Sequence, residues 1–224
     1  MSDLAETLRD EYRMRFEGSS AYRDRVWKIL CRYYFGRRIP KEGRVLDLGA
    51  GWCEFINNIE AADKLAMDLN PDTASRLVEG ARFLQQDCSE PWQVEAGSLD
   101  VVFTSNFLEH LPDKASVERT LGQAWRCLAP GGRVFCLGPN VKYLPGEYWD
   151  FWDHHVALTE LSLSEVLALK GFEVETCIPR FLPYSMSTGR NPPLVFVRAY
   201  LMLPWAWRWF GKQFLVVARK GAAD

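Results

Sequence analysis

The stretch that decides the fold is RVLDLGAGWCEF, residues 44–55. Its first half is a short apolar run of the kind that forms a buried parallel strand. The run ends at Gly49 and Gly51, where glycine lets the backbone turn sharply and lets a ligand approach it closely. The residues from Trp52 onward predict a helix whose first amide groups point back at the turn. We therefore expect a strand, a glycine turn and a helix that together cradle a small cofactor.

A carboxylate closes the next predicted strand, near residues 64–68. Asp68 lies at about the 20-residue offset at which an acidic side chain accepts hydrogen bonds from the hydroxyls of a ribose. The alternative is that Asp68 caps the following helix, but Asn70 with Pro71 behind it is better suited to a helix start. Asp68 is therefore a candidate ribose ligand.

Beyond the glycine turn, predicted strands alternate with helices. The strands are expected at residues 45–48, 64–68, 82–86, 99–104, 133–137, 172–178 and 213–219. The helices are expected at residues 71–78 and 112–128, followed by a helix with a capping box from Ser162 to Glu165 that stops at Gly171. Strands separated by helices imply right-handed crossovers and a mostly parallel sheet with helices on both faces. The fold class is α/β.

Composition limits the organisation and the location of the chain. With 224 residues and 48% hydrophobic content, one domain over residues 1–224 is expected. A net charge of -2 disfavours a nucleic-acid partner. The six cysteines form no CxxC pair, and the acidic N-terminus lacks the layout of a secretion signal, so a cytoplasmic location is expected.

Two segments stand out at the rim of the predicted sheet. Helical spacing over residues 3–35 predicts two helices, and residues 1–40 would form a lid over the cofactor or pack against the sheet. The aromatic-rich residues 138–158 predict a substrate loop, because aromatic faces can enclose a substrate and attract a cation. The alternative for this loop is an aromatic plug over the core.

The order of these segments resembles a class I S-adenosylmethionine-dependent methyltransferase over roughly residues 43–220. The matching stretches are VLDLGAG (45–51), MDLN (67–70), QDC (86–88), LDVVFTSNFLEHL (99–111) and LAPGGRV (128–134). The resemblance implies a Rossmann-like seven-stranded sheet whose last strand is antiparallel. It also implies S-adenosylmethionine as the cofactor.

The resemblance assigns a cofactor-binding set, which is Asp47, Gly49, Ala50, Gly51, Asp68, Leu69, Asp87, Cys88 and Asn106. In this set Asp47 and the glycine turn would hold the methionine part, and Asp68 the ribose. Asp87 and the main chain of Cys88 would hold the adenine, and Asn106 would lie beside the amino group and the sulfonium. Cys53 departs from the family pattern, which has a third glycine there.

Three histidines are candidates for a general base if the acceptor is a hydroxyl: His110, His154 and His155. His110 follows the fourth predicted strand, and the other two follow the fifth. Of the three, His154 or His155 is favoured as the base. The alternative is that these side chains hydrogen-bond the loop in place. His154 and His155 with the nearby Asp150 and Asp153 could suggest a metal site, but no metal is expected, because consecutive side chains rarely converge on one ion.

Residues 179–211 form an insert before the last strand. Its apolar part, residues 192–210, is interrupted by Arg198, Pro204 and Arg208 too often to span a membrane. Tryptophans beside arginines suit peripheral contact with the inner membrane surface. The alternative is a helix packed on the sheet edge or against a second copy in a homodimer.

These patterns predict a methyltransferase that acts on a hydroxyl of a sugar, glycan or lipid-type acceptor. One alternative is an NAD(P)-dependent oxidoreductase, since Gly49, Gly51 and Asp68 also suit a dinucleotide fold. Cys53 and the adenine-type Asp87 argue against it. The other alternative is a catalytically silent binding protein with the methyltransferase fold.

Overall fold

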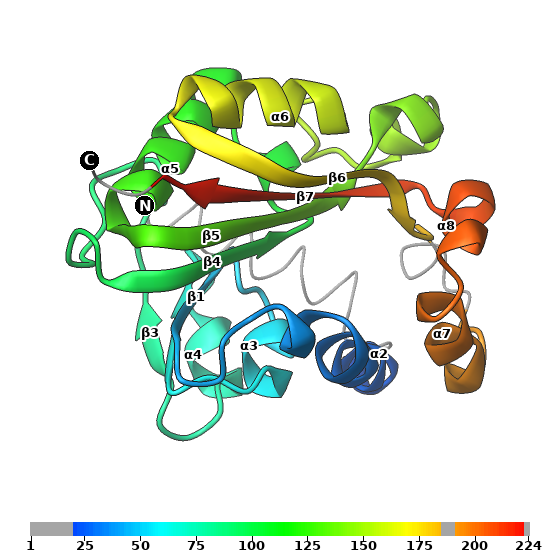
Figure 1. Ribbon diagram of the computed structural model, residues 1–224, viewed down its shortest axis with the longest axis horizontal. Coiled ribbons are helices and arrows are strands. Elements are labelled where there is room, and N and C mark those ends of the chain that lie inside the picture. Colours follow the sequence, from blue (N-terminus) through cyan, green and yellow to red (C-terminus); the bar gives the residue numbers. More distant parts are fainter. Residues whose placement is uncertain (1–19, 185–190, 222–224) are drawn as a thin grey trace. The chain divides into compact units, whose positions relative to one another are not determined.

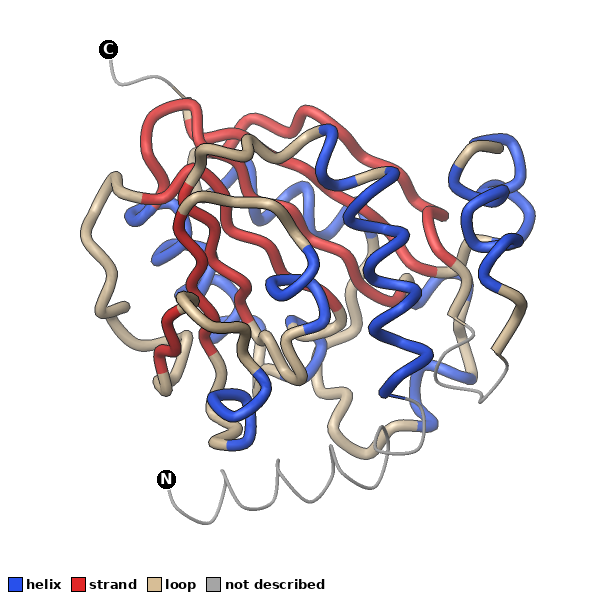
Figure 2. The backbone as a smooth tube through the Cα atoms, turned by 90° about the horizontal axis from the view of Figure 1, so that it is seen from below, coloured by secondary structure: helices blue, strands red, loops and turns tan. Residues whose placement is uncertain are grey.

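The structure is a computed structural model that describes residues 20–184 and 191–221. The described chain contains helices, strands and connecting loops (Figure 2). The chain divides into two compact units, one formed by Met1–Asp87 with Ser185–Pro204 and the other by Cys88–Tyr184 with Trp205–Asp224. The organisation as one domain stays a prediction.

The first unit contains a parallel sheet with the strand order β3-β2-β1 (Figure 1). Its strands are β1 (Arg44–Leu48), β2 (Asp63–Met67) and β3 (Arg82–Leu84). Its helices are α2 (Ser20–Tyr33), η2 (Phe35–Arg37), α3 (Glu54–Asn58), α4 (Asp72–Arg76) and α7 (Leu194–Leu201). The apolar run of the sequence is β1, and its last four residues are buried. This confirms the expected buried strand before the glycine turn.

Helix α2 is part of the core of the first unit. Its buried side chains are spaced three and four residues apart, and the ring of Trp27 lies edge-on to Phe55 of α3 at 6.1 Å. The Cys31 thiol also contacts the carbonyl of Phe55 at 3.8 Å. These contacts favour the packing interpretation of α2, and the lid stays a prediction. The other predicted N-terminal helix lies outside the described residues.

The second unit contains a mixed sheet with the strand order β4-β5-β7-β6. Its strands are β4 (Leu99–Ser105), β5 (Leu128–Pro139), β6 (Phe172–Leu182) and β7 (Gln213–Lys220). Its helices are η3 (Leu108–His110), α5 (Lys114–Cys127), η4 (Val141–Tyr143), η5 (Glu147–Asp150), α6 (Glu160–Leu169) and α8 (Pro204–Phe210). Strands β4 and β5 are parallel, whereas β7 is antiparallel to β5 and β6, as expected for the last strand. Helix α6 runs along β6 and β7 (Figure 1).

The start of α6 differs from the expected one. The helix begins at Glu160, and its capping box joins Thr159 to Ser162 rather than Ser162 to Glu165. The Thr159 hydroxyl accepts from the Ser162 amide at 3.1 Å, while the Ser162 hydroxyl accepts from the Thr159 amide at 3.0 Å. A serine at the third helical position can therefore replace the usual glutamate, which moves the helix start upstream. Among the described residues, no helix is long and apolar enough to cross a membrane.

Candidate functional site

The glycine turn after β1 is tied to the end of β2. Gly49 and Gly51 have φ angles of 70° and 50°, in the left-handed region that glycine adopts at little cost. The amides of Gly49 and Ala50 both donate to the carbonyl of Met67, at 2.9 and 3.2 Å. The turn thus has a defined shape, and it lies beside the predicted ribose ligand.

Asp68 is held by main-chain amides from both sides. Its Oδ2 accepts from the Gly51 amide at 2.7 Å, and its Oδ1 accepts from the Asn70 amide at 2.8 Å. Burial raises the pKa of Asp68, while hydrogen bonds from Asn70, Gly51 and Leu69 lower it. A carboxylate has about four acceptor sites, so capacity for a ribose hydroxyl remains after these three amides. The residues present therefore fit the adenosyl part of the expected cofactor.

Asp47 has the most buried carboxylate of the turn region, with an exposed fraction of 3%. Burial raises its pKa well above the usual value, although a hydrogen bond from the Ile56 amide opposes the shift. The nearby charges of Glu54 and Asp68 raise the pKa further. Asp47 thus links β1 to the start of α3. Its contact with the methionine part of the cofactor stays a prediction.

The backbone conformation of Cys53 explains why the family pattern has a third glycine at this position. It has a φ of 65°, in the left-handed region, immediately before α3 begins at Glu54. Glycine takes this conformation without strain, whereas a cysteine does so at a cost. The Cys53 side chain is buried, and its thiol contacts the carbonyl of Thr73 at 3.5 Å. Cys53 therefore keeps the turn geometry that glycine would adopt at this position of the family pattern.

The remaining cofactor candidates are divided between the units. Leu69 belongs to the first unit, and its carbonyl accepts from Gln85 at 3.2 Å. Asp87 is the last residue of that unit before Cys88 begins the next. Asn106 follows β4 with a φ of 49°, and its amide group donates to Ser105 at 2.9 Å. Thus the structure brings Gly49, Ala50, Gly51 and Asp68 together within one unit, while the roles of the other candidates stay predictions.

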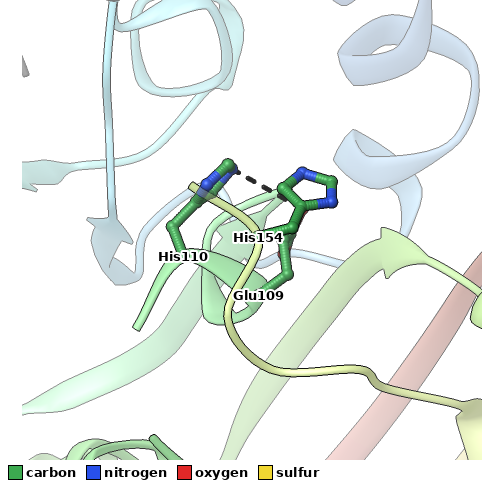
Figure 3. A group of neighbouring side chains, drawn as sticks. All are labelled: Glu109, His110 and His154. Carbon is green, nitrogen blue, oxygen red and sulfur yellow. Dashed lines mark ion pairs between the residues drawn. The ribbon is translucent and has the colours of Figure 1, made fainter. Parts of the chain in front are cut away.

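In the second unit, His110 and His154 lie side by side although they come from separate segments (Figure 3). Their rings are 4.8 Å apart and nearly perpendicular. His110 Nδ1 lies 2.9 Å from a carboxylate oxygen of Asp153, and His154 Nδ1 lies 2.7 Å from the carbonyl of Tyr148. Burial lowers the pKa of His110, but its contacts with Asp153 and Glu109 raise it on balance.

Glu109 places a buried carboxylate beside these rings. Its exposed fraction is 2%, and its Oε1 lies 3.9 Å from Nε2 of His110 (Figure 3). Within the part of the chain that the structure describes, this oxygen has no hydrogen-bond partner. Burial raises the pKa of Glu109, against the opposing effect of His110. A carboxylate of this kind is costly to bury without a partner.

The structure separates the third histidine from the other two. The side chain of His155 is exposed, and its amide donates to the carbonyl of Glu109 at 2.9 Å. Sequence reasoning missed Glu109 as a member of the cluster formed with His110 and His154, and it considered Asp153 only beside His154 and His155. The available signal for Glu109 was its position, since it is an acidic residue immediately before a candidate base.

The aromatic loop contains both buried and exposed rings, and its role as a substrate loop stays a prediction. Tyr148 is fully buried, and its hydroxyl donates to the carbonyl of Val156, which agrees with a plug over the core. Trp152 in contrast has an exposed fraction of 89%, and Trp149 is also exposed. The loop is therefore anchored by one aromatic side chain and presents others to solvent.

Comparison with known proteins places this geometry in a family. The model of the methyltransferase domain matches residues 20–176. Methyltransferase str2 from Strobilurus tenacellus is 37% identical over 93 residues, which are 40% of this chain and 33% of that protein. Phosphoethanolamine N-methyltransferase 1 from Triticum aestivum is 31% identical over 101 residues, 41% of this chain and 20% of that protein. The chain thus spans a third or less of the length of these curated relatives.

Solved structures share the fold over nearly the whole chain. A methyltransferase solved in complex with the Trm112 activator of Haloferax volcanii has a TM-score of 0.70 at 18% identity, covering 97% of this chain and 99% of that one. An S-adenosylmethionine-dependent methyltransferase from Archaeoglobus fulgidus has a TM-score of 0.66 at 21% identity, covering 93% and 98%. These matches confirm the Rossmann-like fold class. Because the domain model covers well over half of the chain, the protein belongs to the methyltransferase domain family, the class I methyltransferases whose cofactor is S-adenosylmethionine.

Proposed function

We propose that the protein transfers the methyl group of S-adenosylmethionine to a hydroxyl oxygen of a small sugar, glycan or lipid-type acceptor. The observation that supports the donor most directly is the Asp68 carboxylate, oriented by the amides of Gly51 and Asn70 at 2.7 and 2.8 Å. A carboxylate fixed in this way beside a glycine turn suits an adenosyl ribose. The family match supports the same donor.

In the proposed reaction the acceptor oxygen attacks the methyl carbon of the sulfonium. A carbon–oxygen bond forms as the carbon–sulfur bond breaks, and its electron pair stays on sulfur, which leaves S-adenosylhomocysteine. The hydroxyl proton passes to a base or to solvent. The departing thioether is neutral and needs no proton, so alignment contributes most, about 7–11 kcal/mol. A general base adds about 10²–10⁴-fold.

For the proton, we propose His110 and His154 rather than the exposed His155. Nδ1 of His110 faces a carboxylate oxygen of Asp153, and Nδ1 of His154 faces the carbonyl oxygen of Tyr148. Both oxygens can only accept a hydrogen bond. Each neutral ring therefore carries its proton on Nδ1 and its lone pair on Nε2. This arrangement supports a role for Nε2 in removing the proton of the acceptor.

A hydrophobic part in the acceptor is supported by the loop that follows β5. Trp149 and Trp152 are exposed there, next to the anchored Tyr148. Exposed aromatic faces suit the apolar side of a sugar or the chain of a lipid-type molecule. The acceptor class is thus inferred from the chemistry of this loop.

We also propose that helix α8 contacts a membrane surface. Trp205, Trp209 and Phe210 are largely exposed there, and Arg208 is exposed between them. Indole rings next to a cation suit the interface between lipid headgroups and acyl chains. Contact with a second copy of the chain is the competing use of the same surface.

The proposed function is tested with methyl-labelled S-adenosylmethionine and a panel of hydroxyl and amine acceptors. A labelled ether product from a hydroxyl acceptor, together with S-adenosylhomocysteine, is expected. Calorimetric titration with S-adenosylhomocysteine and with NADH accompanies the screen. Tight binding of NADH alone would favour the oxidoreductase. Binding of S-adenosylhomocysteine without a labelled product from a complete cell extract would favour a silent binding protein.

A further inference from the structure

Two imidazoles and one carboxylate converge in the second unit in a way that methyl transfer alone does not require. Glu109, His110 and His154 each offer one ligand atom, and these atoms all lie within 4.8 Å of one another (Figure 3). We propose that these three side chains bind one divalent transition-metal ion.

The first support is the orientation of the two rings. Metal-binding histidines usually donate the proton of the nitrogen that does not bind the metal to a carboxylate or a carbonyl. His110 has its Nδ1 2.9 Å from the Asp153 carboxylate, and His154 has its Nδ1 2.7 Å from the Tyr148 carbonyl. Both rings therefore have the outer contacts of a metal ligand, and both direct the lone pair to Nε2.

The second support is independent of the rings. Glu109 is buried to all but 2% of its surface, yet its Oε1 has no hydrogen-bond partner within residues 20–184 and 191–221. Buried side-chain oxygens are nearly always satisfied by a protein group, water or an ion. This oxygen lies 3.9 Å from Nε2 of His110. A cation beside it would satisfy the carboxylate.

The backbone explains how residues far apart in the sequence meet. Glu109 and His110 belong to η3, whereas His154 follows η5. The carbonyl of Glu109 accepts from the amides of His155 and Val156 at 2.9 and 3.1 Å, which joins the two segments. The expectation against a metal considered His154 and His155 with the nearby Asp150 and Asp153. The cluster instead uses His154 with the adjacent pair Glu109 and His110 from another segment.

The donor set indicates the class of ion. Imidazole with carboxylate suits Zn²⁺, Mn²⁺, Fe²⁺ or Co²⁺, whereas Mg²⁺ and Ca²⁺ prefer oxygen ligands alone. Bonds of about 2.0–2.2 Å place neighbouring ligand atoms roughly 3–3.5 Å apart, so the side chains would close slightly around the ion. With the ion bound, the Nε2 lone pairs of His110 and His154 would be used as ligands, so the ion would replace the histidines as the means of activating the acceptor. Three protein ligands would leave a position for an acceptor oxygen, whose pKa the ion would lower. This catalytic role rests on the proposed function, whereas binding of the ion does not.

The test is titration of the untagged, chelator-treated full-length protein with Zn²⁺, Mn²⁺ and Mg²⁺ in a calorimeter. One transition-metal ion per chain is expected, with weaker or no binding of Mg²⁺. Co²⁺ loading adds a visible spectrum that reports nitrogen ligands. Glu109→Gln and His154→Ala should each weaken binding at least tenfold, since even outer-contact changes cost about 10–100-fold. The matched controls Glu118→Gln and His155→Ala should bind as the wild type does.

Absence of ion binding by the wild type would overturn the proposal, as would equal affinity in Glu109→Gln and the wild type. Circular dichroism and titration with S-adenosylhomocysteine check that each variant is folded. Cofactor binding is a suitable check because the proposed ribose ligand, Asp68, lies in the other unit and is not altered by these substitutions. Loss of metal binding with cofactor binding retained supports the site. If neither the wild type nor any variant binds S-adenosylhomocysteine, the proposed function fails, whereas the measured metal binding still supports the metal site.

Discussion

Replacement of Asp68 by alanine tests the cofactor site most directly. The carboxylate accepts the Gly51 amide through Oδ2 and the Asn70 amide through Oδ1, and it keeps capacity for at least one ribose hydroxyl. A hydrogen bond to a charged group contributes about 1.5–3 kcal/mol. At 1.36 kcal/mol per decade, loss of one such bond weakens binding of S-adenosylhomocysteine by about 10- to 150-fold.

The effect on stability should be smaller, because two contributions oppose each other. Asp68→Ala removes the acceptor for the amides of Gly51, Asn70 and Leu69, which destabilises the turn. It also removes a carboxylate whose pKa is raised by burial, which relieves the cost of a buried charge. The free energy of unfolding should therefore change less than the free energy of binding.

The assay is calorimetric titration with S-adenosylhomocysteine, together with urea unfolding of the same samples. Asp63→Ala is the matched control, because Asp63 begins the same strand and pairs on the surface with Arg44 and Arg82. It should leave the dissociation constant unchanged. An Asp68→Ala protein that is folded and binds S-adenosylhomocysteine with the affinity of the wild type would refute the ribose assignment.

Three further predictions concern charge, backbone and surface. Burial raises the pKa of Asp47 above its usual 3.8, so the folded state holds the proton more tightly and stability falls as pH rises above that value. Asp47→Asn should accordingly raise the free energy of unfolding at neutral pH, and it should give no gain below pH 3.8. A lower free energy of unfolding at neutral pH would contradict this expectation. Because Cys53 has a φ of 65°, Cys53→Gly should be more stable to urea than Cys53→Ala by about 1 kcal/mol, the reverse of the usual order. In flotation with anionic liposomes, the wild type and Trp152→Ser should float, whereas the Trp205→Ser/Trp209→Ser protein should not; a wild type that stays in the soluble fraction would remove the membrane proposal.

Much of the fold follows from local pattern. The short apolar run before Gly49 and the alternation of strands with helices are signals carried by neighbouring residues, and each predicted strand is present with its bounds shifted. Strand β5 extends upstream to Leu128, whereas the sequence pattern predicted a strand only over residues 133–137. Such bounds depend on pairing with a neighbouring strand, which local pattern does not contain.

In the candidate site, too, some features follow from local sequence and others depend on tertiary packing. The pairing of the glycine turn with Asp68 was predictable, because the turn and the following strand end are separated by one helix and must meet at the same edge of a parallel sheet. The sequence by itself thus determined that the glycine turn and Asp68 lie together. Only the tertiary structure decided which histidines lie together, since it buries the carboxylate of Glu109 beside His110 and brings His154 to them while the side chain of His155 is exposed. Neighbours in sequence point in different directions, and the convergence of ligands from two segments is a property of the packed chain.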